Sequence, residues 1–213
     1  MELEYFFSFR STYAFLSFHR LKRALPELDV SLTPYAVFPP PEGPEPQVSA
    51  DPRHFAYMLH DFARHCEAYG LAMKPPLAKD TDWMPSHAAF YFAQEKGKGL
   101  AYLEAGYACR FQRQLDLGRD EVLRDIATEV GLDPEALVRA AHSDTQREQV
   151  RAGMQRFFDQ GMVGVPGFVV GEQRFWGNDR LEWVIRAIFE AQGRTVPDLA
   201  RDPLAHPAPL KDR

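Results

Sequence analysis

Two polar segments, far apart in the 213-residue chain, carry the residue types best suited to chemistry. The first is Ser11, which follows an apolar run of strand length and directly precedes a helical pattern. The first N–H groups of a helix are unpaired and favour an anion, so a hydroxyl there can cap its own helix or donate to a bound anion. Both roles stay open from the local sequence. No G-x-S-x-G surrounds Ser11, so a Ser-His-Asp triad is not predicted.

The second segment runs from Gly164 to Arg180 and contains the step Val165-Pro166. Proline has no N–H for a sheet ladder, so Pro166 is predicted at the first residue or edge of a strand. A cis bond would expose the backbone of Val165 to whatever lies opposite. The sequence does not determine the isomer, and most X-Pro bonds are trans.

Asn178 and Asp179, near the end of this segment, have two interpretations. Asp179 and Glu182 have the spacing of a capping box, which gives both residues a structural role. An acidic side chain beside free N–H groups can also hold an amino-acid head group, with its amine on the carboxylate and its carboxylate on the backbone.

The histidines and the aromatic residues do not predict a further site. His60 and His65 are five residues apart, which misses the i, i+4 spacing of a helical metal site, and no metal is predicted. Several aromatic residues could line a pocket, but their helical spacing is typical of an ordinary core. These residues are Trp83, Tyr91, Phe92, Tyr107, Phe111 and Trp176.

Composition narrows the function classes. The chain is 45% hydrophobic and 26% charged, which is ordinary for a globular protein. A net charge of −5 and the absence of a basic run argue against a nucleic-acid partner. No apolar stretch approaches the ~20 residues of a membrane span, so no membrane partner is expected.

The cysteines and the N-terminus suggest a cytoplasmic protein. Cys66 and Cys109 form neither a CxxC nor a metal spacing, so they are expected to be buried, reduced thiols. Glu2 and Glu4 lie inside an apolar strand pattern, which a signal peptide would not contain.

The first forty residues predict a βαβ unit, because parallel strands need such a crossover. The helix is expected to end before Pro26, and Pro34 suggests an edge strand or a bulge. A proline-rich loop follows over residues 39–52. The predicted strands span residues 3–9 and 29–37, and the helix spans 12–25.

The middle of the chain is predicted to be helical, and the C-terminal part to be ββα. An apolar stripe indicates an amphipathic helix ended by Gly70, and Asp133 and Ser143 are predicted N-caps of later helices. This order indicates an α/β fold with a large helical insertion. Helices are predicted over 53–69, 86–96, 100–115, 119–130, from 134, 144–160 and 180–192, and strands over 168–170 and 173–176.

Three stretches together resemble the 2-hydroxychromene-2-carboxylate isomerases, relatives of kappa-class glutathione transferases and of DsbA-type thioredoxin-fold proteins. They are FFSFRSTYAFLS, YMLHDFARHCEAYG and GVPGFVVGEQRFWGNDRLEWV. The resemblance covers nearly the whole chain and implies a thioredoxin-like fold, usually as a homodimer. It implies a discontinuous thioredoxin-like domain over 1–38 and 161–195, a helical domain over 53–160 and a surface tail over 196–213.

The resemblance also implies a site. Ser11 matches the family's catalytic serine, and Val165-Pro166 matches its cis-proline pair, whose backbone binds the cysteinyl part of glutathione or another low-molecular-weight thiol. Asn178 and Asp179 match the pair that holds the γ-glutamyl end. The family's glutathione-binding lysine falls on His54.

The sequence departs from the family's usual pattern beside these positions. Thr12 follows the serine where proline is frequent. Gly167 follows the cis-proline pair where threonine is common, which predicts looser packing on the side of the site that this residue forms. Redox relatives would need cysteines at Ser11 and Ala14, so disulfide exchange at this site is excluded on chemical grounds.

The implied activity is cis–trans isomerisation of an aromatic, electron-poor alkene acid by reversible addition of a thiolate. A kappa-like transferase, which conjugates glutathione to electrophiles, is one alternative. A non-enzymatic binding protein with a thioredoxin fold is the other.

Overall fold

The computed structural model describes residues 1–38, 52–75, 77 and 81–199. The predicted proline-rich loop and the tail beyond residue 199 therefore lie outside the described residues, apart from Pro52, which begins a helix. Within the described ranges, no helix is both long and apolar enough to cross a membrane. The proposed division into a discontinuous domain and a helical domain stays a prediction.

A four-stranded mixed sheet forms the centre of the molecule, in the order β2-β1-β3-β4. It consists of β1 (Glu2–Phe7), β2 (Ser31–Ala36), β3 (Gly167–Val170) and β4 (Gln173–Trp176). The first two strands are parallel, and β3 is antiparallel to both of its neighbours. β2 is an edge strand, which agrees with the prediction from its proline.

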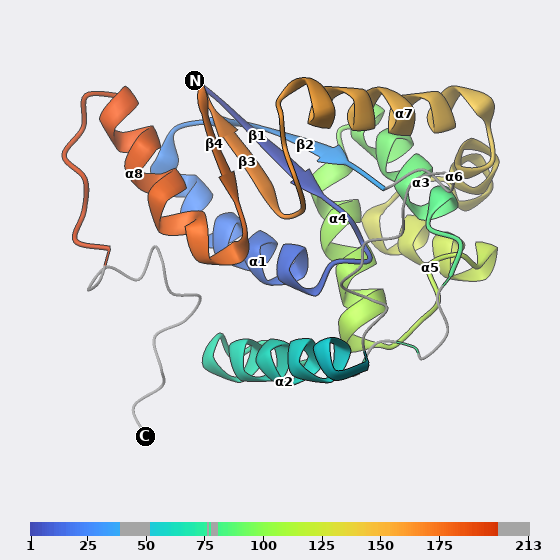
Figure 1. Ribbon diagram of the computed structural model, residues 1–213. Coiled ribbons are helices and arrows are strands. Elements are labelled where there is room, and N and C mark those ends of the chain that lie inside the picture. The colour runs from blue at the N-terminus through green and yellow to red at the C-terminus, as the bar shows by residue number, and fades with distance from the viewer. Residues whose placement is uncertain (39–51, 76, 78–80, 200–213) are drawn as a thin grey trace.

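Two helices cover one face of this sheet: α1 (Thr12–Leu28) and α8 (Leu181–Ala191) (Figure 1). The prediction that α1 ends before Pro26 was wrong. The helix continues to Leu28, which is fully buried, and ends at Asp29 in the left-handed conformation. Burial of Leu28 in the core offsets the backbone hydrogen bond that a proline inside a helix removes.

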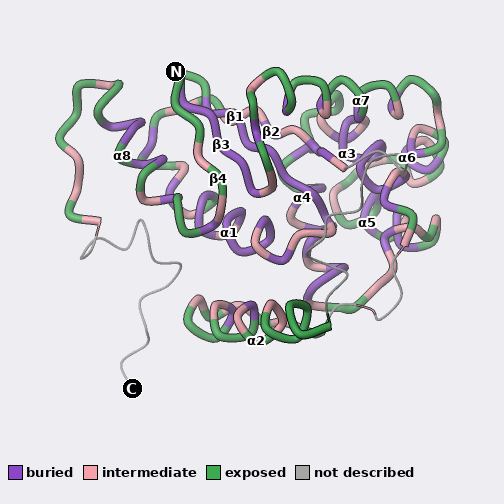
Figure 2. The backbone as a smooth tube through the Cα atoms, in the orientation of Figure 1, coloured by how far each residue is buried: buried purple, intermediate pink, exposed green. Residues whose placement is uncertain are grey.

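The inserted segment is helical. Asp133 and Ser143 are the N-caps of α6 and α7, as predicted, since each side chain accepts from the backbone three residues on. Figure 2 shows that α2 is largely exposed, and only Phe62 and Cys66 on it are buried. The elements are α2 (Pro52–Ala68), α3 (Met84–Glu95), α4 (Gly99–Tyr107), η2 (Ala108–Gln112), α5 (Asp120–Val130), α6 (Pro134–Ala141) and α7 (Asp144–Asp159).

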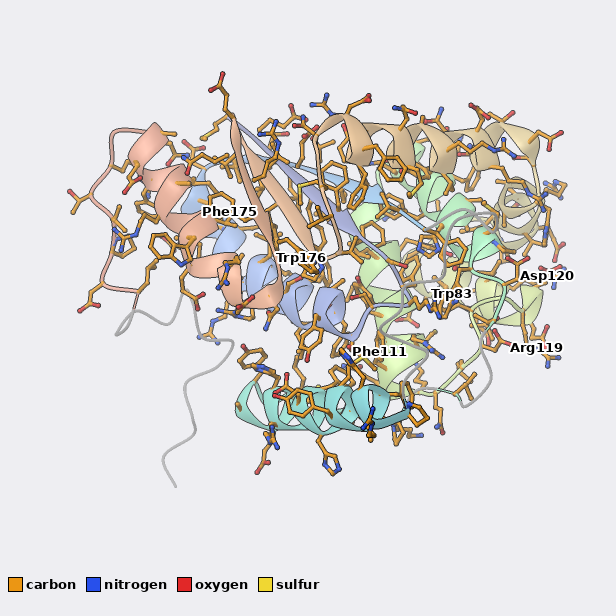
Figure 3. The ribbon with its side chains drawn as sticks, in the orientation of Figure 1. Trp83, Phe111, Arg119, Asp120, Phe175 and Trp176 are labelled. Atoms are coloured by element: carbon orange, nitrogen blue, oxygen red, sulfur yellow. The ribbon has the colours of Figure 1, made fainter. Side chains whose placement is uncertain are left out.

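The predicted helix over 100–115 changes to a π-turn at η2. Cys109, Arg110 and Phe111 are all buried in this wider turn. Most of the aromatic residues considered as pocket lining belong to the core instead, as their helical spacing indicated. Trp83 and Phe111 are fully buried, while Trp176 on β4 is 57% exposed. Figure 3 labels these three side chains.

His87 on α3 joins the helical segment to the turn that follows β1. Its Nδ1–H donates to the Trp83 carbonyl at 2.7 Å. Its Nε2 accepts from the Ser8 hydroxyl at 3.1 Å and from the Phe9 N–H at 3.3 Å. Burial lowers the pKa of His87 to about 4, so the ring is neutral at physiological pH and holds this tautomer.

This burial predicts an acid-sensitive fold. Between pH ~6.5, the ordinary histidine pKa, and pH ~4, the unfolded chain binds a proton at His87 that the folded protein does not. The free energy of unfolding should therefore fall by about 3 kcal/mol from this residue as the pH drops through that window. Denaturant titrations at pH 7.5 and 4.5 should show a smaller pH-dependent loss for His87→Gln than for the wild type. Equal losses in both proteins would contradict the assignment.

Candidate active site

The sheet register brings the two chemistry-bearing segments to one end of the sheet. Phe6, near the end of β1, pairs with Gly167, and Gly167 pairs with Trp176 at the end of β4. The turn leading to Ser11 and the step before Gly167 therefore meet at the same sheet end, where α8 also begins (Figure 1). This is the arrangement that the proposed site requires.

The Ser11 hydroxyl acts as a hydrogen-bond acceptor within the protein, and its role as a donor is not used by the described residues. It is the N-cap of α1, and its Oγ accepts from the Ala14 N–H at 3.1 Å, so its predicted capping role is confirmed. Within the described part of the chain no group accepts its O–H, and the residue is partly exposed. A hydroxyl in this state can donate to a ligand without losing its cap.

The Val165-Pro166 bond is cis. The Pro166 carbonyl accepts from the Gly177 N–H at 2.9 Å, which fixes this loop against the residues after β4. Neither the N–H nor the C=O of Val165 has a hydrogen-bond partner among the described residues. Its backbone is therefore open to pair with an extended ligand.

The space beside Gly167, next to this loop, is filled by other atoms. The expectation that glycine at this position would loosen the packing was therefore wrong. A Cβ on Gly167 would lie 2.6 Å from Cε of Met162 and 3.2 Å from the carbonyl of Gly164. The methionine side chain occupies the space that a threonine would need. Met162, five positions before Gly167, thus compensates for the missing side chain. This is a packing effect that no motif encodes.

A pocket of about 350 Å³ adjoins this end of the sheet. The Tyr13 hydroxyl donates to Asp61 Oδ2 at 2.7 Å, and His65 Nε2 lies 3.6 Å from the same oxygen. Burial, followed by the bond to Asp61, raises the pKa of Tyr13, so it stays a phenol. The lining residues are Tyr13, Asp61, His65, Asn178 and Asp179.

Asn178 is held from behind by Arg20 of α1. Both residues are buried, with exposed fractions of 4% and 3%. Arg20 Nη1 donates to the Asn178 carbonyl at 2.6 Å and to its side-chain Oδ1 at 3.2 Å, while Nη2 pairs with Glu182. The guanidinium also lies over the ring of Tyr69, 5.4 Å from its centre.

These contacts show that the predicted capping box of Asp179 and Glu182 was wrong. Glu182 is engaged with Arg20, and Asp179 is exposed and pairs with Arg180 at 2.9 Å. Residues Asn178–Arg180 form a 3-10 turn, and α8 begins after it without a side-chain cap. Asp179 lines the pocket while its carboxylate pairs with Arg180.

The sequence did not identify the contribution of α2. His54 lies in the first turn of α2 and is exposed, whereas the pocket residues of this helix, Asp61 and His65, lie further on. Seven residues separate His54 from Asp61, which is about 10 Å along a helix. The i, i+4 spacing of Asp61 and His65, beside the buried Phe62 and Cys66, was the available signal.

Cys66 and Cys109 are free and buried, as predicted. Burial raises the pKa of the Cys66 thiol to about 12 and that of Cys109 to about 11, so neither forms a thiolate near neutral pH. No metal-binding cluster of His, Cys, Asp or Glu occurs in the part of the chain that the structure describes.

The model of the DsbA-like thioredoxin domain matches residues 2–189. The chain belongs to this family. Over 128 residues it is 28% identical to a 2-hydroxychromene-2-carboxylate isomerase from Sphingobium xenophagum, covering 60% of this chain and 64%, just under two thirds, of that isomerase.

Solved structures show the same fold. A 2-hydroxychromene-2-carboxylate isomerase superposes with a TM-score of 0.79 at 18% identity, covering 90% of this chain and 96% of that chain. The cytosolic disulfide reductase DsbM from Pseudomonas aeruginosa, in a structure with GSH, has a TM-score of 0.67 at 16% identity and covers 92% and 100%. The predicted thioredoxin-like fold and the resemblance to the isomerases are confirmed.

The state of the two cysteines gives a direct prediction. With their pKa values raised by burial, both thiols should react with Ellman's reagent at pH 7.5 at least about a hundredfold more slowly in the native protein than in guanidinium chloride. Fast labelling of either thiol in the native state would show that the protein has a reactive thiol of its own.

Proposed function

We propose that this protein is a glutathione-dependent cis–trans isomerase that acts on an aromatic, electron-poor alkene acid. The observation that supports it best is the unused O–H of Ser11 at the N-terminus of α1, at the same sheet end as the open backbone of Val165. The similarity to the Sphingobium isomerase favours this chemistry over others.

Three features support a bound thiol tripeptide. Its cysteinyl part would pair with the backbone of Val165 beside Pro166, like an added strand. Its γ-glutamyl end would lie in the pocket at Asn178 and Asp179, and its sulfur beside Ser11. Asp61 and His65, rather than His54, would supply the contacts from α2. A related fold is known with GSH in the DsbM structure.

The thiol must come from the ligand, because both cysteines of the chain are buried and protonated. A hydrogen bond from Ser11 to a thiolate is worth about 1.5–3 kcal/mol, and a helix N-terminus adds about 0.3–1 kcal/mol. At about 1.36 kcal/mol per unit, these lower a thiol pKa from about 8.5 by roughly one to three units. Thiolate then becomes the main form near neutral pH.

The reaction needs no oxidant. The thiolate sulfur bonds to one carbon of the double bond, and the π electrons move onto the conjugated carbonyl as an enolate. The former double bond is now a carbon–carbon single bond, and rotation about it follows. The enolate then re-forms the double bond and expels the thiolate, so the nucleophile is returned unchanged.

Disulfide exchange at this position is not part of the proposal. Ser11 and Ala14 occupy the start of α1 where a redox pair would need two cysteines. We also propose a reducing, cytoplasmic setting, which suits two free thiols. A kappa-like transferase would instead release a stable conjugate with a chlorinated aromatic, which absorbance detects.

Replacement of the serine tests the proposal. Ser11→Ala should lower isomerase turnover at least about tenfold, because it removes the donor to the thiolate. It should also cost about 0.5–2 kcal/mol of stability through loss of the N-cap. Turnover with glutathione and a 2-hydroxychromene-2-carboxylate substrate, together with thermal unfolding, measures both effects.

Ser143→Ala is the matched control, since Ser143 caps α7 in the same way but lies in the helical insertion, between α6 and α7. It should show a similar loss of stability and full turnover. An unchanged rate in Ser11→Ala, or an equal rate loss in both variants, would remove Ser11 from the mechanism.

A further inference from the structure

The turn that places Ser11 is held by a buried side chain from the helical insertion. The last three backbone N–H groups before α1 all donate within the protein. The Phe9 N–H donates to His87 Nε2 at 3.3 Å, and the Arg10 N–H donates to Ser8 Oγ at 3.3 Å. The Ser11 N–H donates to the Ser8 carbonyl at 3.0 Å. The path of this turn therefore depends on two residues, Ser8 and His87.

His87 determines the direction of the Ser8 hydroxyl. A carbonyl can only accept, so the contact between Nδ1 and the Trp83 carbonyl at 2.7 Å places the ring proton on Nδ1. Nε2 is then an acceptor, and Ser8 Oγ directs its proton toward it across 3.1 Å. The lone pairs of the same oxygen remain for the Arg10 N–H. In the opposite tautomer, Nε2–H would face the Phe9 N–H, which is also a donor.

The Ser8 carbonyl is fixed from a second side. Tyr107 of α4 donates its hydroxyl to this oxygen at 3.2 Å, alongside the Ser11 N–H. Ser8, His87 and Tyr107 are all buried, so water is not at hand to replace these bonds. A buried donor or acceptor that loses its partner costs free energy. Removal of the His87 acceptor should therefore shift the turn rather than leave it in place.

The position of this turn matters for what Ser11 can offer a ligand. Its N–H is engaged by Ser8, and its Oγ accepts from the Ala14 N–H. The O–H is the polar hydrogen of Ser11 that no described residue takes up. Hydrogen bonds weaken steeply with distance and angle, so this O–H must be held at one place to donate to a ligand atom. The backbone at Ser11 determines that place.

We infer that His87 is a positioning residue, which through Ser8 holds the Ser11 hydroxyl where it donates to the thiolate of bound glutathione. His87 contacts Ser8 and Phe9 rather than Ser11, so it acts through the turn. The inference rests on the proposed function and gives α3 of the insertion a part in stabilising the thiolate.

Two amide variants of His87 separate this role from packing. The side chain in His87→Asn keeps a donor for the Trp83 carbonyl but is too short to reach Ser8. The longer side chain in His87→Gln places an acceptor near the position of Nε2. The thiol pKa of bound glutathione, from absorbance at 240 nm against pH, should rise by about one unit in His87→Asn and by less than about 0.3 unit in His87→Gln.

A second ligand and a matched variant serve as controls. S-methylglutathione has no thiol to ionise, and its affinity, from calorimetry, should change less than about twofold in both variants. Tyr91→Phe removes another buried hydrogen bond of α3, from the Tyr91 hydroxyl to the Ala36 carbonyl at 3.1 Å. It should leave the pKa of the bound thiol unchanged. In the Ser11→Ala background, His87→Asn should add no further rise, because it acts through Ser11.

A wild-type pKa of the bound thiol in His87→Asn would overturn the inference, as would equal rises in His87→Asn and Tyr91→Phe. A rise together with much weaker binding of S-methylglutathione would also overturn it, because His87 would then support the fold alone. If His87→Asn does not fold, Ser8→Ala removes the hydroxyl that His87 holds. It should raise the pKa of the bound thiol by a similar amount, and a wild-type value in it overturns the inference.

The same titration separates this inference from the proposed function. If glutathione does not bind the wild type, or titrates there at its free value, the proposed function is wrong and the inference falls with it. If Ser11→Ala raises the pKa of the bound thiol while the His87 and Ser8 variants do not, the proposed function stands and the inference alone is overturned.

Discussion

The pairing of β1 with β3 is the constraint on which the site depends. These strands come from opposite ends of the chain, and their register sets Phe6 opposite Gly167. A slip of one residue would turn every side chain of β3 to the other face of the sheet, so burial of Phe168 and Val170 in the core fixes it. The turn before Ser11 and the Val165-Pro166 step therefore stay at one end of the sheet whatever the insertion between them does.

Two buried polar networks hold this sheet end from different sides. Neutral His87 bonds Ser8 and Phe9, which ties the helical insertion to the turn before Ser11. Arg20 bonds Asn178, which ties the loop before α8 to the same helix that Ser11 caps. Both networks are satisfied by groups with fixed donor and acceptor roles, so they determine orientation as well as position. The insertion thus contributes to the site through its contacts with the turn and through the pocket residues of α2.

Local chemistry explains which features the sequence predicted. The strand β4 and the caps Asp133 and Ser143 depend on neighbours within a few residues, and each was found. The continuation of α1 through Pro26 is accompanied by burial of Leu28 in the core, which the local sequence does not show, and it was missed. The π-turn at η2 and the methionine that fills the space beside Gly167 follow no motif, and both were missed. Asp179 and Glu182 have the spacing of a capping box, yet a buried arginine far along the chain engages the glutamate instead. For the site, the motif gave the serine and the proline, while the pocket residues of α2 needed the tertiary structure.

The central claim is that the start of α1 converts a bound thiol into a thiolate. Absorbance at 240 nm, followed against pH for glutathione bound to the protein, reports that ionisation directly. The account predicts a bound thiol pKa roughly one to three units below the usual value of about 8.5. A bound thiol that titrates at or above that value would contradict it.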